Sequence, residues 1–282
     1  LIVTVDACNE LSIVNNSGTR IFNLTVPPSN GRAFEVEIGD FTGDGFARDI
    51  VFVTGFNSPN NVYVLNSSNG NNWSVLWNRT LIYHTEEIVI GDFDQDGKED
   101  DIAMSEGGSG AMRTHVYFGN NGTEIWGVES LGTYSGHSIE VIDLDNDGFK
   151  DELIIGRSER IYAFGFNGSF GFNYTASDSI WPYITLPTDS DYIWDIKSFA
   201  YHSDGLINDF VTVDDENIFA FDNDSNQLWN YTNAIGRIFS LDIEDINNDG
   251  NVEIVAGGEA SIVYVFNKTG SLLFEFDLER GT

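Results

Sequence analysis

The stretch Asp92-Phe-Asp-Gln-Asp-Gly-Lys-Glu-Asp-Asp101 decides the fold, because related stretches recur along the chain at a fixed period. Three further copies begin at Asp40, Asp143 and Asp245, so successive copies lie 52, 51 and 102 residues apart, and the last interval is twice 51. A missing copy is expected near residues 194–200, and residues 201–209 fit it as a decayed version. Such periodicity indicates one structural unit repeated along the chain.

Each copy lies between apolar runs that have the character of β-strands. An alternating run precedes it, and three more follow, separated by turns rich in Asn, Gly and Asp. Period-2 alternation bounded by such turns is the strand signal, and no window shows a helical apolar stripe. The unit is therefore four short antiparallel strands, A to D. A radial array of such units is a β-propeller, which avoids long exposed sheet edges.

We predict an all-β fold, a single β-propeller domain over residues 1–282, with about six four-stranded antiparallel blades. Residues 1–27 form a partial blade that contains strands B to D. Complete blades are predicted at residues 34–80, 86–130, 138–176, 192–232 and 236–279. Three explanations of the partial blade stay open: the chain once continued past 282, the blade has three strands, or a neighbouring molecule completes it. The linker 175–192 is expected to loop over one face.

The repeated Asp-x-Asp-x-Asp-Gly motif predicts calcium loops in the A–B hairpins, at about four sites. Alternate positions of a tight loop point oxygens inward, glycine makes the bend, and a later acid completes the six to eight oxygen ligands of Ca²⁺. Without a cation these carboxylates would repel one another, and zinc prefers Cys and His. The candidate ligands are side chains plus one carbonyl per loop: Asp40, Thr42, Asp44, Phe46 and Asp49; Asp92, Asp94, Asp96, Lys98, Asp100 and Asp101; Asp143, Asp145, Asp147, Phe149, Asp151 and Glu152; and Asp245, Asn247, Asp249, Asn251 and Glu253.

The sequence leaves open which acid closes each calcium shell. Counting from the glycine gives Asp100 and Asp151 in the second and third loops, whereas counting back from strand B gives Asp101 and Glu152. The site at Asp40 is expected to be the weakest, because a threonine and an arginine replace two acids of its loop.

With its four Asp-x-(Asp/Asn/Thr)-x-Asp-Gly loops and Gly-Asp-Phe at residues 39–41 and 91–93, the chain resembles the FG-GAP repeat family. That family includes the propeller repeats of integrin α subunits and many microbial surface proteins, archaeal ones among them. The resemblance covers nearly the whole chain and implies a propeller with calcium in the A–B hairpins, used for adhesion or scaffolding. An extra residue before strand B in three loops departs from the family pattern. Trp77, Trp126 and Trp229 also resemble the tryptophan-bearing repeats of quinone-dependent dehydrogenases, a likeness we rank second.

A second pattern consists of Asn-x-Ser/Thr sequons, the acceptor motif for N-glycosylation. None lies in a calcium loop; six fall in the C–D turns and five in or around strand D. The eleven asparagines are Asn15, Asn23, Asn66, Asn72, Asn78, Asn121, Asn167, Asn173, Asn223, Asn230 and Asn267. The alternative is that repeats simply copy turn-forming residues. We expect several sites to be glycosylated, which implies an exported protein of a eukaryote or an archaeon.

Composition excludes several classes of function. The chain has 45 acidic and 13 basic residues and a net charge of −32, so it is no nucleic-acid binder, and anionic lipid would repel it. Cys8 is the single cysteine, so no intrachain disulfide forms. No apolar run approaches the roughly 18 residues of a membrane helix, and membrane insertion is not expected. The chain begins without Met or a leader, which we interpret as a mature, exported chain at the cell surface or outside the cell.

Nothing in the sequence indicates catalysis, and we expect a non-enzymatic protein. His84, His115, His137 and His202 form no spaced metal motif, and nucleophile-elbow, P-loop and dinucleotide fingerprints are missing. The leading hypothesis is a calcium-stabilised extracellular propeller for adhesion, surface-layer or filament assembly. Its partners would be surface proteins or glycans, or further copies joined through the incomplete first blade. The alternative is a lectin or polysaccharide-active enzyme that uses paired acids and surface aromatics such as Trp73, Trp181 and Trp194.

Overall fold

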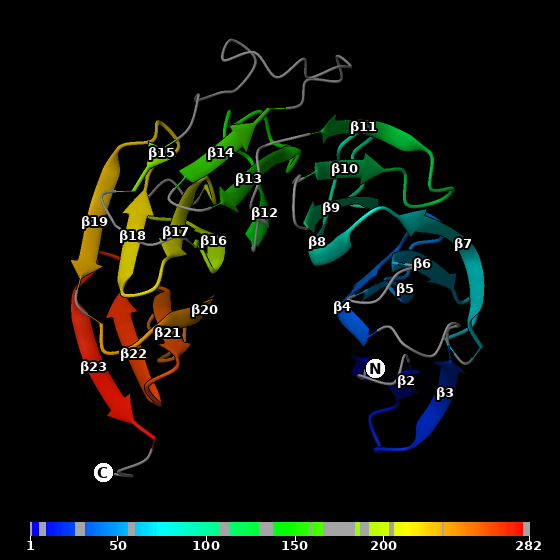
Figure 1. Cartoon of the computed structure of the whole chain (residues 1–282), viewed down its shortest axis with the longest axis horizontal. Helices are drawn as coiled ribbons and strands as arrows, with labels where there is room; N and C mark the ends of the chain where they lie inside the picture. Colours follow the sequence, from blue (N-terminus) through cyan, green and yellow to red (C-terminus); the bar gives the residue numbers. More distant parts are fainter. Residues whose placement is uncertain are drawn as a thin grey trace. The chain divides into compact units, whose positions relative to one another are not determined.

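The computed structural model describes residues 2–5, 10–25, 32–55, 60–70, 72–107, 113–129, 138–157, 160–165, 184–186, 192–202, 206–232 and 234–278. These residues form strands and turns (Figure 1). None of them forms a helix long and apolar enough to cross a membrane. The strands pair into one three-stranded and five four-stranded antiparallel sheets, and strands that follow one another along the chain lie side by side in each sheet. The prediction of an all-β chain of repeated four-stranded sheets is therefore confirmed.

The strands of each sheet come from one continuous part of the chain. The first two sheets are β1 (Ile2–Val5), β2 (Glu10–Val14) and β3 (Arg20–Thr25), then β4 (Arg32–Gly39), β5 (Asp49–Gly55), β6 (Asn60–Asn66) and β7 (Ser74–Leu81). The third is β8 (His84–Gly91), β9 (Asp101–Gly107), β10 (Arg113–Tyr117) and β11 (Glu124–Glu129). The fourth is β12 (Ser138–Ile142), β13 (Glu152–Arg157), β14 (Arg160–Phe164) and β15 (Ile184–Thr185). The last two are β16 (Asp195–Phe199), β17 (Asp209–Val213), β18 (Asn217–Phe221) and β19 (Gln227–Thr232), then β20 (Ile238–Glu244), β21 (Glu253–Gly258), β22 (Ile262–Asn267) and β23 (Leu272–Asp277).

The chain divides into two compact units, residues 1–135 with 166–173 and residues 136–165 with 174–282. In the first unit, one apolar core joins the sheets β1–β3 and β4–β7, and another joins β4–β7 to β8–β11. In the second unit, equivalent cores join β12–β15 to β16–β19, and β16–β19 to β20–β23. Face-to-face burial of the apolar side of each sheet is the main force that holds neighbouring sheets together.

A tryptophan on the fourth strand ties one sheet to the next in each unit. Trp77 Nε1 donates to the carbonyl of Gly119 at 2.6 Å, and Trp229 Nε1 donates to the carbonyl of Lys268 at 3.0 Å. Gly122 shows how closely the ring packs, because a Cβ there would lie 2.7 Å from the Trp77 ring, and its φ is +68°. These tryptophans therefore act as inter-sheet packing residues in the described structure.

One strand departs from the sequence prediction. The fourth strand of the sheet β12–β15 is Ile184–Thr185, which pairs with Arg160 and Ile161. It lies beyond residue 176, where the predicted blade ended, and inside the segment predicted as a linker. Both residues are β-branched and favour extended backbone. Cys8, His137, Asn167, Asn173, Trp181 and residues 203–205 of the decayed copy lie outside the described residues.

Candidate metal-binding loops

The four Asp-rich loops connect the first and second strands of four sheets. They lie between β4 and β5, β8 and β9, β12 and β13, and β20 and β21. In every case the last residue of the first strand pairs with the first residue of the second, so the loop closes a β-hairpin. The motif thus lies in the A–B hairpins, where the sequence predicted it.

The loops share one hydrogen-bonding pattern around their first aspartate. Its two carboxylate oxygens accept the backbone N–H groups of the residues four and five positions later. The pairs run from Asp44 and Gly45 to Asp40, from Asp96 and Gly97 to Asp92, from Asp147 and Gly148 to Asp143, and from Asp249 and Gly250 to Asp245, at 2.6–3.1 Å. All four loops share these hydrogen bonds although their sequences differ. The first aspartate therefore holds the loop conformation through protein contacts alone.

The backbone of the loops turns through two left-handed positions. The fourth residue, which is Gly43, Gln95, Asn146 or Asn248, has a φ between 57° and 65°. The sixth is always glycine, with a φ between 86° and 96°, a region where a Cβ is disfavoured. The glycine of the motif is therefore required by the backbone, as the sequence analysis argued.

One candidate closing acid begins the second strand in every loop. Asp49, Asp101, Glu152 and Glu253 occupy this register position, and each is at most 3% exposed. Counting back from strand B therefore identifies one equivalent acid in all four loops, whereas Asp100 and Asp151 precede that position. The fourth loop reaches the same register with one residue fewer.

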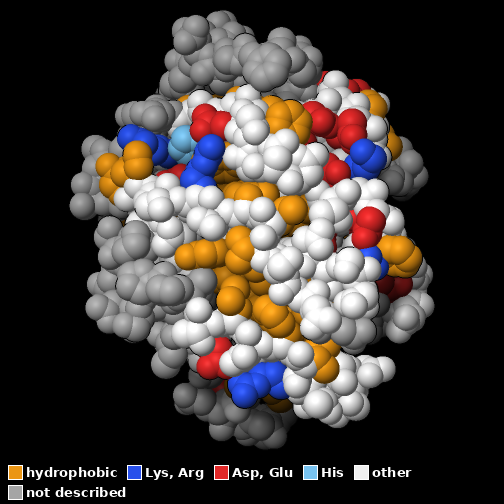
Figure 2. All heavy atoms as spheres, turned by 90° about the vertical axis from the view of Figure 1, so that its right-hand side faces the viewer, with side chains coloured by type: hydrophobic (Ala, Val, Ile, Leu, Met, Phe, Trp, Pro, Cys, Tyr) orange, Lys and Arg blue, Asp and Glu red, His pale blue; other side chains and the backbone are white. Residues whose placement is uncertain are grey.

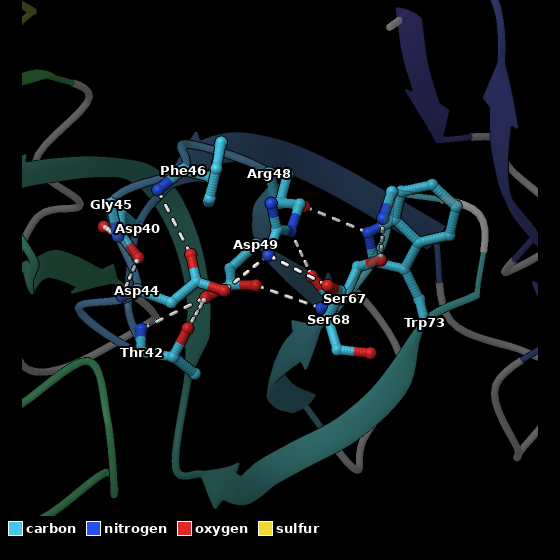
Figure 3. Close-up of polar contacts among 11 residues, drawn as sticks. Asp40, Thr42, Asp44, Gly45, Phe46, Arg48, Asp49, Ser67, Ser68 and Trp73 are labelled. Atoms are coloured by element: carbon cyan, nitrogen blue, oxygen red, sulfur yellow. Dashed lines mark hydrogen bonds and ion pairs between the residues drawn. The ribbon is translucent and has the colours of Figure 1, made fainter.

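In the first and fourth loops, a neutral side chain satisfies the closing acid. Thr42 donates to Asp49 Oδ2 through both its backbone N–H, at 3.1 Å, and its hydroxyl, at 2.9 Å, and Ser67 N donates to Asp49 Oδ1 (Figure 3). Asn247 Nδ2 donates to Glu253 Oε1 at 3.0 Å. These two buried carboxylates therefore have protein hydrogen-bond partners.

In the second loop, an aspartate replaces that neutral donor. Asp94 stands at the position of Thr42, and an ionised carboxylate cannot donate a hydrogen bond to Asp101. Asp101 Oδ2 is buried without a hydrogen-bond partner. Burial, and next the charge of Asp94, raise the pKa of Asp101 to about 8. Ligand atoms of Asp92, Asp94 and Asp96 lie within 4.8 Å of one another, so carboxylate oxygens converge in this loop, where Lys98 pairs with Asp96.

The third loop repeats this arrangement with Asp145 at the same position. Ligand atoms of Asp143, Asp145 and Glu152 lie within 4.8 Å of one another. Burial, and next the charge of Asp151, raise the pKa of Glu152 to about 9. Leu144 N donates to Glu152 Oε2 at 2.8 Å, which holds the carboxylate against the loop. An all-oxygen cluster of this kind fits a hard divalent cation such as Ca²⁺.

Basic side chains also touch the loops, in different ways. In the first loop, the Arg48 guanidinium pairs with Asp44 and donates to the carbonyls of Ser67 and Ser68, which fixes it in place (Figure 3). In the second loop, Lys98 Nζ lies 2.5 Å from Asp96 Oδ2, and its side chain is 55% exposed. An exposed ion pair such as that of Lys98 contributes little to stability, so a metal cation can displace the lysine. Arg48 is held in its loop by its additional hydrogen bonds.

The decayed copy keeps the closing acid, which sequence reasoning did not single out. Asp209 begins β17, pairs in register with Phe199 and is fully buried. Its Oδ2 accepts the backbone N–H of Tyr201 at 2.8 Å and lies 3.4 Å from His202 Nδ1. Counting back from strand B would have found it, because the register position is the same as in the other four loops.

The other candidate residues have mainly structural surroundings. Trp73 is 6% exposed and donates to the carbonyl of Arg48 at 3.0 Å, so the expectation that it stacks on sugars as a surface aromatic is wrong. Trp194 donates to Asp215 at 2.8 Å and packs edge-on against Phe239. His115 lies between two carboxylates, 3.7 Å from Glu106 and 3.5 Å from Glu124.

Comparison with known proteins agrees with this geometry. Residues 92–154, which contain the second and third loops, match the profile of the FG-GAP-like repeat. Among solved structures, the crystal structure of BBS1N in complex with ARL6DN, soaked with lead, is similar with a TM-score of 0.57 and 12% identity, over 98% of this chain and 75% of that chain. A search of curated proteins gave no significant match.

The structural likeness is at low identity and concerns the fold alone, which is of the β-propeller type. The repeat match is independent of it and falls on the two loops whose acids converge. Residues 92–154 of this all-β chain are therefore an FG-GAP-like repeat, as the sequence predicted.

Proposed function

We propose that the chain is a non-enzymatic, calcium-stabilised propeller of about six blades that serves as an extracellular scaffold for adhesion, surface-layer or filament assembly. The observation that carries the calcium assignment is Asp101, whose buried Oδ2 faces an acidic loop without a hydrogen-bond partner. A buried ionised carboxylate is costly unless it is paired or binds a metal. The donor set contains only oxygens, which favours Ca²⁺ over zinc.

The residue two positions after the first aspartate ranks the four loops by expected calcium affinity. Where Thr42 or Asn247 donates to the closing acid, the loop is complete without a cation. Where Asp94 or Asp145 stands instead, the loop gains a carboxylate and loses that donor. We therefore propose two strong sites, in the loops 92–101 and 143–152, and two weak ones. This revises the expectation of four sites in which the Asp40 loop alone is weakest.

Calcium in these loops would stabilise the scaffold and would not act as a catalyst. Each loop joins two strands of a sheet, so a cation that bridges the first aspartate and the closing acid would link both ends of the hairpin. Binding to the folded state alone stabilises it by mass action. Chelation with EDTA is expected to lower the melting temperature, and an unchanged melting temperature would contradict the calcium assignment.

The first sheet supplies the support for assembly. By sequence, β1 corresponds to the second strand of the other sheets. Among the described residues it pairs only with β2, whereas the second strand of every other sheet also pairs with a first strand. An open edge of this kind can accept a strand from another molecule. Light scattering of the full chain and of a Val3→Pro variant, which removes one backbone N–H of β1, tests this. Equal masses for two monomeric proteins would contradict assembly through β1.

A further inference from the structure

We infer that Asn23, Asn78 and Asn230 form one set of N-glycosylation sites on the outermost strands, at equivalent positions of three sheets. This inference does not depend on calcium, and it shares with the proposed function only the export of the chain. It separates three of the described sequons from those in turns, on geometry that the sequence pattern alone did not show. The modification would attach an oligosaccharide to each asparagine side chain.

The three asparagines occupy the same place in their sheets. Asn23 pairs with Ser12, Asn78 with Tyr63 and Asn230 with Phe219, and each partner lies on the last but one strand of its sheet. An aromatic residue precedes each asparagine, namely Phe22, Trp77 or Trp229. The strands β3, β7 and β19 are the last of their sheets, so no further strand of the same sheet covers their outer edge.

Both essential residues of each sequon point the same way. Residues i and i+2 of a strand lie on one face, which places Thr25, Thr80 and Thr232 beside their asparagines. In all three strands the asparagine and the threonine are exposed, and the residue between them is partly buried. The acceptor amide and its hydroxyl partner are therefore accessible together.

Strand formation does not explain asparagine at these positions. Threonine is enriched in strands, but asparagine is depleted, because it favours turns. Asn78 and Asn230 lie inside β7 and β19 and not in the turns that flank them. The strand does not need asparagine at this position. In the third sheet the equivalent residue, on β11, is Gly127. The pattern aromatic-Asn-x-Thr recurs once more at residues 172–175, outside the described residues.

The turn sequons have a structural reason for their asparagines. Asn15 Oδ1 accepts the backbone N–H groups of Ser17 and Thr19, and Asn267 Oδ1 accepts those of Thr269 and Ser271. These bonds close the turns between the last two strands of their sheets. Turn formation accounts for these residues. On the strands, Asn23 Nδ2 donates to Glu10 Oε1 at 2.9 Å and Asn230 Oδ1 accepts from Gln227 Nε2 at 3.2 Å, but these bonds between exposed side chains close no turn.

The surface around β7 is mostly uncharged. Figure 2 shows the side of the first unit where β7 lies, and most described atoms there are uncharged, with a band of hydrophobic side chains among them. In the modification, the asparagine Nδ2 loses one proton and bonds to the anomeric carbon of a sugar. The phosphate of the lipid-linked sugar donor leaves with the bonding electron pair, and the proton passes to solvent.

Peptide mapping of the full chain, secreted from a eukaryotic host, tests the inference. Enzymatic release of N-glycans in ¹⁸O water converts each occupied asparagine into a labelled aspartate. We expect label at Asn23, Asn78 and Asn230. Label confined to turn sequons, or an intact mass equal to that of the bare chain, would overturn the assignment.

Two substitutions remove a sequon, and a third is the matched control. Asn78→Gln and Asn230→Gln should each remove one glycan from the intact mass, while Thr80→Ser keeps the sequon and should keep its glycan. Circular dichroism of the variants checks that these exposed positions tolerate the change. The peptide map of the wild-type chain needs no variant, so it decides the question even if a variant fails to fold.

Discussion

Replacing Asp101 by Asn should stabilise the protein without calcium and destabilise it with calcium. In the metal-free protein the carboxylate is buried, and its Oδ2 has no hydrogen-bond partner. Its pKa is raised from 3.8 to about 8, so at pH 7 the folded, metal-free protein holds this carboxyl mostly protonated, whereas the unfolded chain holds it ionised. At 1.36 kcal/mol per pH unit between the ordinary pKa and pH 7, taking up that proton on folding costs at most about 4 kcal/mol. Asparagine needs no proton and avoids this cost.

With calcium the order should reverse. A ligand held at about 1,000 times its dissociation constant stabilises the folded state by about 4 kcal/mol, and Asp101→Asn loses most of this gain. Urea unfolding at pH 7, in EDTA and in excess CaCl₂, measures all four free energies of unfolding. A variant less stable than the wild type in EDTA, or one that calcium stabilises as strongly as the wild type, would refute the reasoning.

Asp49→Asn is the matched control, because Asp49 occupies the same register position in the first loop. Its carboxylate accepts hydrogen bonds from Thr42 and Ser67, so the substitution weakens bonds that do not depend on calcium. A loss of about 1–3 kcal/mol is expected in EDTA and in CaCl₂ alike. The two closing acids should therefore differ in the sign of their effect in EDTA.

Three further outcomes follow from the same structure. Burial raises the pKa values of Asp101 and Glu152 to about 8 and 9. The stability of the metal-free protein should therefore be highest near pH 4–5 and fall as the pH rises towards 9, and calcium should remove this trend. Melting curves across pH, in EDTA and in CaCl₂, check it. Thr42→Asp should convert the first loop into a stronger calcium site, seen as one additional tight site in calorimetry. Trp77→Phe removes the hydrogen bond to Gly119 and should cost about 1 kcal/mol in urea unfolding, with or without calcium.

The sequence predicted most of the fold because period and alternation are local signals. The repeat at 51–52 residues located the hairpins, and the sheets fall close to the predicted repeats. The short strand Ile184–Thr185 was missed, because two residues carry too little alternation to stand out from a linker. Trp73 was misjudged for a different reason: only packing shows that its ring is buried against the first sheet.

The sequence predicted where the acidic loops lie, and which of their acids bind a cation stays a prediction. Strand register shows that Asp101, and not Asp100, occupies the position equivalent to Asp49. The contrast between Thr42 and Asp94 was visible in the sequence, but its meaning depends on the closing acid lying opposite, which is a contact across the hairpin. Asp209 was missed for the same reason, because strand register identifies its position and the decayed motif does not.

Calcium stoichiometry tests the central claim most directly. Isothermal titration of the EDTA-treated and dialysed chain with CaCl₂ should show two tight sites, and the double substitution Asp94→Asn and Asp145→Asn should abolish both. Four equivalent sites, or no binding to the wild type, would contradict the proposal that the two loops with converging acids are the calcium centres of this chain.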